Sequence, residues 1–90
     1  MQKRNKLEII RDVLKIIQEN HNSIKITPLI RKSNLSSQRF TEYFNEILEK
    51  DFIQEISDKK GKKTIKLTEK GFKYIEKFNS IISFIEEFGL

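Results

Sequence analysis

The chain has 90 residues, no cysteine and a formal net charge of +5, so we expect one domain without a disulfide framework or a thiolate metal site. A single core of this size buries only roughly 60% of the surface of the unfolded chain, so burial against a partner chain is an expected source of stability. The basic start "MQKRNKLEII" is followed by apolar residues that charged ones interrupt, which excludes a signal peptide and a membrane span.

The first predicted element is an amphipathic helix over residues 5–19. Its apolar residues recur at three- and four-residue spacing, the period of a helix with one buried face. They are Leu7, Ile10, Val13, Leu14 and Ile17. The polar stretch "ENHNS" then supplies stop residues, and "IKI" over residues 24–26 is a candidate short strand.

The next segment predicts two helices separated by a tight turn. Thr27 is placed as the N-cap of a short helix, with Pro28 at the first helical position and an end near Ser33. Ser36 is the next good N-cap. Leu35 before it and Phe40 after it form the pair expected of a hydrophobic staple.

The third helix has one apolar and one polar face. The residues predicted to be buried are Phe40, Tyr43, Phe44, Ile47 and Leu48. At 100° per residue, the opposite face is centred on Gln38, Glu42, Asn45 and Glu49. The aromatic residues at apolar positions, Phe72 and Phe78 included, are interpreted as core residues and not as platforms for stacking bases.

A β-hairpin and a long helix complete the chain. The runs "FIQEIS" and "TIKLT" flank "DKKGKK", which indicates a hairpin in which Ile65 and Leu67 face inward and Lys66 outward. Thr68 is the predicted N-cap of a helix over residues 69–88, with Glu69 in the first turn, where the helix dipole favours an acid.

The last helix carries more apolar residues than one domain needs. Its distal half, "SIISFIEEFGL", would expose isoleucine and phenylalanine side chains to water in a monomer, and an exposed apolar surface of this kind marks an interface. The residues predicted to form a dimerisation surface follow coiled-coil-like spacings. They are Tyr74, Phe78, Ile81, Ile82, Ile85 and Phe88.

The net charge is divided into blocks. Residues 21–41 carry a net charge of +4 and residues 59–77 a net charge of +6, whereas residues 42–58 carry −5. If the fold brings the two basic blocks together, they form one face that attracts polyanions.

The order helix, short strand, helix, turn, helix, two-stranded hairpin and helix is the winged helix-turn-helix arrangement. It is an α+β fold, mostly α, with a three-helix core, a two-stranded β wing and here a long C-terminal helix. At "ITPLIRKSNLSSQRFTEYFNEILEKDFIQEI" and "TIKLTEKGFKYIEKF" the chain resembles the small archaeal winged-helix DNA-binding regulators. That family includes chromatin proteins whose C-terminal helices pair into an antiparallel dimer. The resemblance covers nearly the whole chain, and its most specific pieces are "SNLS" over residues 33–36 and "LTEKG" over residues 67–71.

The resemblance implies a homodimer that binds double-stranded DNA, with residues 36–50 as recognition helix and the loop 59–63 as wing. Residues 1–68 would form the DNA-binding domain, and residues 69–90 a dimerisation helix packed on it. Wing lysines would neutralise phosphates, and the start of the recognition helix would meet base edges. The predicted DNA-binding residues are Arg31, Lys32, Ser36, Ser37, Gln38, Arg39, Thr41, Asn45, Lys59, Lys60, Lys62 and Lys63.

One departure from the family concerns the recognition helix, which often carries basic or aromatic residues. Here Glu42, Glu46 and Glu49 lie on or beside its exposed face. Carboxylates accept from cytosine N4 but repel phosphates. They disfavour lengthwise insertion into the major groove and leave open an approach by the helix N-terminus.

Several functional alternatives stay open. The protein is a transcription regulator or an architectural protein of the chromosome, which implies a cytoplasmic, nucleoid-associated location. The alternative is a protein-interaction module whose acidic third helix docks a basic partner. Lys3, Arg4 and Lys6 form either a basic arm or a plain tail.

No enzymatic activity, cofactor, metal or small-molecule ligand is expected. His21, the only histidine, lies in a polar turn without an acid cluster around it. No serine has a histidine and an acid at a recognisable spacing, and no glycine-rich phosphate loop is present.

Overall fold

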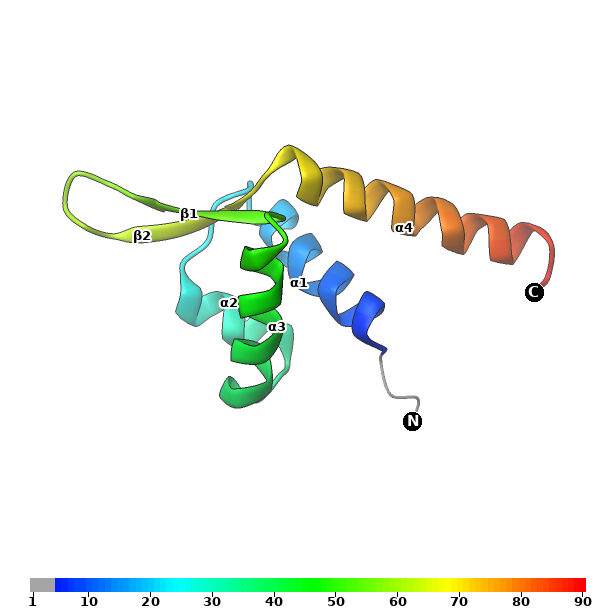
Figure 1. Cartoon of the computed structure of the whole chain (residues 1–90), viewed down its shortest axis with the longest axis horizontal. Helices are drawn as coiled ribbons and strands as arrows, with labels where there is room; N and C mark the ends of the chain where they lie inside the picture. Colours follow the sequence, from blue (N-terminus) through cyan, green and yellow to red (C-terminus); the bar gives the residue numbers. More distant parts are fainter. Residues whose placement is uncertain (1–4) are drawn as a thin grey trace.

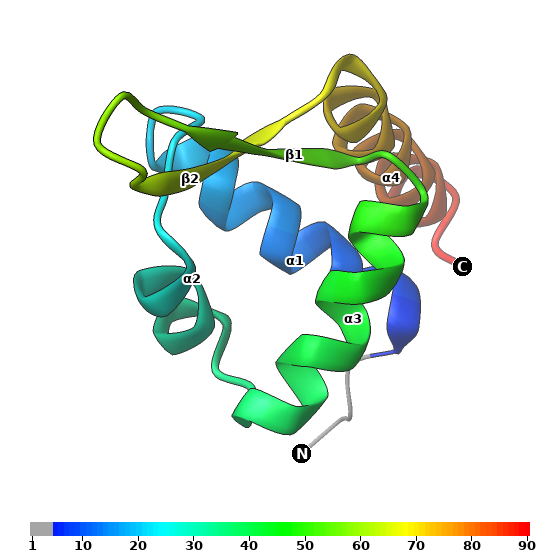
Figure 2. The same ribbon diagram turned by 60° about the vertical axis from the view of Figure 1, so that its left-hand side comes forward.

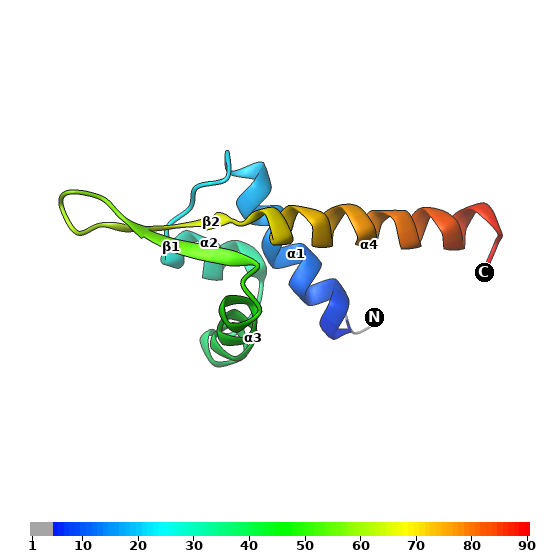
Figure 3. The ribbon, with the colours of Figure 1, turned by 45° about the horizontal axis from the view of Figure 1, so that its top comes forward.

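The computed structural model describes residues 5–90, which form four helices and one two-stranded antiparallel sheet. The elements in chain order are α1 (Lys6–Glu19), α2 (Ile26–Ser33), α3 (Ser37–Glu49), β1 (Ile53–Ser57), β2 (Lys63–Leu67) and α4 (Glu69–Glu87). The hairpin and the distal half of α4 extend in opposite directions from the body formed by α1–α3, and the molecule measures 51 × 28 × 22 Å (Figures 1 and 3). The predicted order of the four helices and the hairpin and the α+β class are confirmed.

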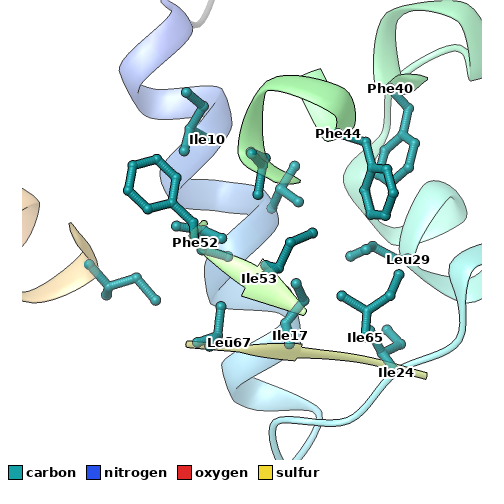
Figure 4. Packing of buried hydrophobic residues seen from close by; sticks show 14 residues of the cluster. Ile10, Ile17, Ile24, Leu29, Phe40, Phe44, Phe52, Ile53, Ile65 and Leu67 are labelled. Carbon is teal, nitrogen blue, oxygen red and sulfur yellow. The ribbon is translucent and has the colours of Figure 1, made fainter. Parts of the chain in front are cut away.

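One hydrophobic core joins α1–α3, the hairpin and the start of α4. Figure 4 shows Ile10 and Ile17 of α1 facing side chains from α2, α3 and both strands. Phe40 and Phe44 stack with ring centroids 5.3 Å apart. The predicted apolar face of α3 is confirmed, with Phe40, Phe44 and Ile47 buried and Tyr43 and Leu48 partly buried. Burial of these side chains supplies most of the driving force for folding.

The hairpin follows the predicted pattern. Ile53 pairs with Leu67 and Ser57 with Lys63, which places Ile65 and Leu67 in the core. The predicted strand over residues 24–26 is wrong. Only Ile24 forms a bridge, with both of its backbone hydrogen bonds to Ile65, because the chain enters α2 at Ile26.

The predicted start of α2 is also wrong. Lys25 is the N-cap and makes no side-chain capping bond, so Thr27 and Pro28 are the second and third residues of the helix. Proline is tolerated there because amides throughout the first turn lack an intrahelical acceptor. Thr27 and Pro28 therefore indicate the first turn of α2, but not which positions of that turn they occupy. The predicted end at Ser33 is confirmed, with Asn34 in the left-handed conformation at φ 59°.

The start of α4 explains the glycine of "LTEKG". Thr68 caps the helix by accepting a hydrogen bond from the Gly71 amide at 3.1 Å, and its own amide donates to the Phe52 carbonyl. A Cβ atom at Gly71 would lie 2.2 Å from that carbonyl oxygen. Only glycine therefore allows α4 to approach the junction between α3 and β1 this closely.

The two halves of α4 have different environments. Ile75 is buried, Tyr74 contacts the Phe52 ring, and the Arg11 guanidinium lies 4.6 Å from the centre of the Phe78 ring. Phe72 is 39% exposed, so its assignment to the core is wrong. All residues from Asn79 to the end of the chain are exposed.

Lys6 begins α1, whereas Lys3 and Arg4 of the predicted basic arm lie outside the described residues. None of the helices within residues 5–90 combines the length and apolar character needed to cross a membrane.

Candidate nucleic-acid interface

The hairpin, α2 and α3 lie along the edges of one face of the molecule, and the distal half of α4 extends away behind this face (Figure 2). Each residue predicted to contact DNA is exposed to solvent. These residues belong to three groups, namely the start of α3, the wing, and the end of α2.

The first turn of α3 is a capped helix N-terminus that is exposed to solvent. The Ser36 hydroxyl accepts a hydrogen bond from the Arg39 amide at 3.2 Å, as predicted for the N-cap. The Thr41 hydroxyl donates to the Ser37 carbonyl at 2.8 Å. Helix geometry leaves the amides of Ser37 and Gln38 without intrahelical acceptors. Such amides, together with the positive end of the helix dipole, suit a phosphate oxygen.

The three glutamates of α3 do not all lie on its outer face. The Glu46 carboxylate accepts from the Lys6 ammonium at 2.7 Å, so it faces α1. Glu42 and Glu49 remain exposed on the outer face. The repulsion of phosphates by α3 therefore comes from two carboxylates, both C-terminal to Gln38 and Arg39.

The wing tip is an ordered turn organised by Asp58. Its carboxylate accepts hydrogen bonds from the amides of Lys60 at 2.8 Å and Lys62 at 2.9 Å. The Gly61 amide donates to the Asp58 carbonyl, and Gly61 has φ 79°. An aspartate at the first position and a glycine at the fourth are typical of a type I turn followed by a left-handed residue.

The role of Asp58 was not predicted from the sequence, although the D-x-x-G spacing in "SDKKGKK" is typical of such a turn. The turn holds the backbone of the four wing lysines in one arrangement while their side chains stay exposed. It also places one carboxylate inside the basic cluster, which lowers the positive potential of the wing.

The basic residues at the end of α2 are only partly directed to this side. The Lys32 ammonium donates to the Asn20 side chain at 3.3 Å. It lines a shallow hollow with Asp12, Lys15 and Glu19 of α1. The hairpin and α3 therefore border the same side of the molecule (Figure 2), whereas Lys32 lies beside the end of α1.

The titratable residues of the described chain show whether it could hold a metal ion and which group has a shifted pKa. Within residues 5–90, no group of three or more histidine, aspartate or glutamate side chains is placed to hold a metal ion. Burial raises the pKa of the Tyr74 phenol above its ordinary value, and this residue lies at the contact between α1 and α4, away from the wing.

Comparisons with known proteins place the chain among winged-helix proteins. A family model described as winged helix-turn-helix matches residues 3–86, and no curated protein matches. Sso10a-2, a DNA-binding protein from Sulfolobus solfataricus, superimposes with a TM-score of 0.74 at 19% identity over 94% of this chain and 85% of that one. F93 from STIV, a winged-helix DNA-binding protein, superimposes with a TM-score of 0.72 at 19% identity over 89% of this chain and 91% of that one.

Proposed function

Because the chain belongs to the winged helix-turn-helix family, we propose that it binds double-stranded DNA. The main support is the wing, where Asp58 orders a turn with four exposed lysines, Lys59, Lys60, Lys62 and Lys63. The hairpin that carries this turn borders the same side of the molecule as α3 (Figure 2). Two proteins of similar fold are described as DNA-binding, which supports the proposal.

The wing and α3 have different tasks in this proposal. The wing lysines contact phosphates, which supplies affinity without sequence information. Gln38 and Arg39 are presented to the major groove, where their two-pronged side chains suit adenine and guanine. Ser36, Ser37, Thr41 and Asn45 are exposed in the same part of the chain. Arg31 stays a candidate phosphate contact, whereas Lys32 would have to leave Asn20 to reach the DNA. Glu42 and Glu49 favour an approach by the N-terminus of α3, because this approach keeps their carboxylates away from the phosphates of the DNA.

The second part of the proposal is a homodimer formed through α4. Its distal half exposes large apolar side chains, with Ile81 59% and Phe88 61% exposed. Residues 69–77 of α4 carry three lysines and two glutamates, a net charge of +1, whereas its end carries Glu86 and Glu87. An antiparallel pair brings opposite charges near each other, whereas a parallel pair brings Glu86 and Glu87 against their copies.

The DNA proposal is tested by removing the wing charge. Wild-type protein is expected to bind a duplex at low salt, with log K falling linearly with log salt concentration. The test variant replaces the wing lysines with alanine, namely Lys59, Lys60, Lys62 and Lys63. Its salt slope should be smaller by up to about 0.9 per lysine that contacts a phosphate, with a large loss of affinity.

A control with the same change in net charge replaces four lysines of α1 and α4 with alanine, namely Lys15, Lys70, Lys73 and Lys77. Anisotropy titrations should show nearly wild-type binding for this variant. No measurable duplex binding by the wild type at low salt would overturn the proposal. Comparing a random duplex with the promoter of the protein's own gene then separates an architectural protein, which binds both equally, from an operator-specific regulator.

A second candidate function follows from the exposed carboxylates Glu42 and Glu49. They would fit a basic protein partner docked on α3 without nucleic acid. The variant with four wing alanines distinguishes the two functions, because an interaction centred on α3 should not respond to the loss of the wing lysines.

A further inference from the structure

A groove of about 300 Å³ lies between α2, α3 and the hairpin, in the region that these elements surround in Figure 2. Its apolar lining comes from Ile26 and Ile30 of α2, Phe40 and Phe44 of α3, and Ile65 of β2. The volume is at the lower end of the range for small-molecule sites. Ile26 is 41% exposed although it borders the core, so the groove leaves apolar surface in contact with water.

Two opposite charges lie at the sheet side of this groove. Glu55 of β1 is paired with Ile65, and Lys63 of β2 is paired with Ser57. Because side chains alternate along strands, Glu55, Lys63 and Ile65 share the inner face of the hairpin, and Glu55 and Lys63 are diagonal neighbours across it. Both line the groove. Within the described chain, neither makes an ion pair with another residue.

We propose that this groove binds a free α-amino acid with an apolar side chain. The ammonium group of the ligand donates to the Glu55 carboxylate, and its carboxylate accepts from the Lys63 ammonium. The apolar side chain lies against the isoleucines and phenylalanines of the floor. A groove with a single charge would select a cation or an anion, whereas an acid and a base beside an apolar floor match a zwitterion with an apolar side chain. The sequence alone did not predict such a ligand.

The position of the groove links occupancy to DNA binding. Lys63 is one of the wing lysines, and Thr41, which also lines the groove, lies on the part of α3 presented to DNA. The zwitterion leaves the net charge unchanged, but a ligand carboxylate paired with Lys63 occupies the ammonium that would otherwise contact a phosphate, so we expect the amino acid to weaken duplex binding. This consequence depends on the proposed DNA-binding function, whereas the ligand site itself does not.

The site is tested without DNA, by titrating the full-length protein with L-phenylalanine and recording the isoleucine methyl resonances. Saturable shifts are expected at Ile26, Ile30 and Ile65. Glu55→Gln should weaken L-phenylalanine binding by about tenfold, because a charge-assisted hydrogen bond is lost. The same variant should also weaken phenethylamine, which lacks the carboxylate, but leave 3-phenylpropionate, which lacks the ammonium, unaffected. Lys63→Gln should show the reverse preference.

The control variant is Glu42→Gln, which removes a carboxylate from the outer face of α3 and should leave the affinity for L-phenylalanine unchanged. Thermal unfolding establishes that each variant is folded. The proposal is overturned if no saturable shift occurs at millimolar L-phenylalanine, or if Glu55→Gln and Glu42→Gln behave alike. Groove shifts that follow protein concentration instead of ligand concentration would assign the groove to a second copy, and would also overturn it.

The coupling is tested separately by repeating the DNA titration with saturating L-phenylalanine. Duplex affinity should fall, and the salt slope should decrease by about one. Unchanged affinity with an occupied groove would overturn the coupling alone. Absence of DNA binding in all conditions would overturn the proposed function and leave the ligand titrations as the test of the site.

Discussion

Tyr74 connects α4 to α1 through one hydrogen bond. Its hydroxyl donates to the Leu7 carbonyl at 2.8 Å, and its ring lies between those of Phe52 and Phe78. Burial is the main cause of its raised pKa; the nearby Arg11 charge acts in the opposite direction, and Glu46 adds a smaller upward contribution. The folded state therefore favours the protonated phenol, which is also the hydrogen-bond donor.

This arrangement predicts a pH dependence of stability at high pH only. A group with a raised pKa in the folded state contributes its full stabilisation below its unfolded pKa, which is about 10 for tyrosine, and loses it as pH rises through the folded pKa. Tyr74→Phe should lower the free energy of unfolding by about 0.5–1.5 kcal/mol at neutral pH. Denaturant unfolding of both proteins should show this difference constant up to about pH 9 and shrinking above pH 10. A difference that grows above pH 10 would contradict the assignment.

Single residues also show where sequence reasoning succeeds and fails. The caps Ser36 and Thr68 were predictable, because a cap bonds to an amide three residues away. The ion pair between Lys6 and Glu46 was not, because it joins elements whose approach only the fold decides.

At the scale of elements, the wing depends on the turn that Asp58 organises. Asparagine at this position keeps an oxygen that can accept from the amides of Lys60 and Lys62 and removes the negative charge. Alanine removes both. The two substitutions therefore separate the order of the turn from its electrostatics.

We expect Asp58→Asn to increase duplex affinity and steepen the salt dependence, because one carboxylate leaves the lysine cluster. Asp58→Ala should gain less affinity, because the turn loses two hydrogen bonds and the lysines are ordered only on binding. Anisotropy titrations of both variants measure the difference, and amide exchange at Lys60 and Lys62 reports on the turn. Lower affinity of Asp58→Asn than of the wild type would contradict this account.

The helices illustrate the limits of local signals. Apolar periodicity predicted the face of α3 correctly, because a helix buries one stripe against a single core. It also predicted the face of α1 except for Leu7, which is 56% exposed because it lies in the first turn, beyond the edge of the core. The start of α2 was misplaced, because good first-turn residues specify a turn and not a position within it. The strand predicted at residues 24–26 is a single bridge between Ile24 and Ile65 of β2. It extends no further because α2 begins at Ile26.

At the scale of the whole molecule, the distal half of α4 leaves its apolar residues exposed to solvent. Ile82 and Ile85 are each 36% exposed, and Phe84 is 56% exposed. At 100° per residue, Ile82 lies on the apolar stripe and Ser83 near the centre of the opposite face. A dimer through this stripe buries Ile82 and leaves Ser83 in water.

Ile82→Glu should therefore weaken the dimer by at least about a hundredfold, because it places an unpaired charge in the interface. Ser83→Glu adds the same charge on the other face and should leave the dimer intact. Truncation after Phe78 should yield monomers or aggregates. Sedimentation equilibrium measures each case. A wild-type chain that sediments as a monomer at micromolar concentration would refute the dimer.

The sequence by itself determined the class of fold, the number and order of the helices, the hairpin and the apolar excess of α4, because these follow from periodicity, caps and turn residues that act over a few positions. Only the tertiary structure decided where the charges go. It turned Glu46 towards Lys6, Lys32 towards Asn20, and Glu55 and Lys63 towards a common groove. The lysine cluster in "SDKKGKK" forms the tip of the hairpin because the strands on either side of it pair with each other.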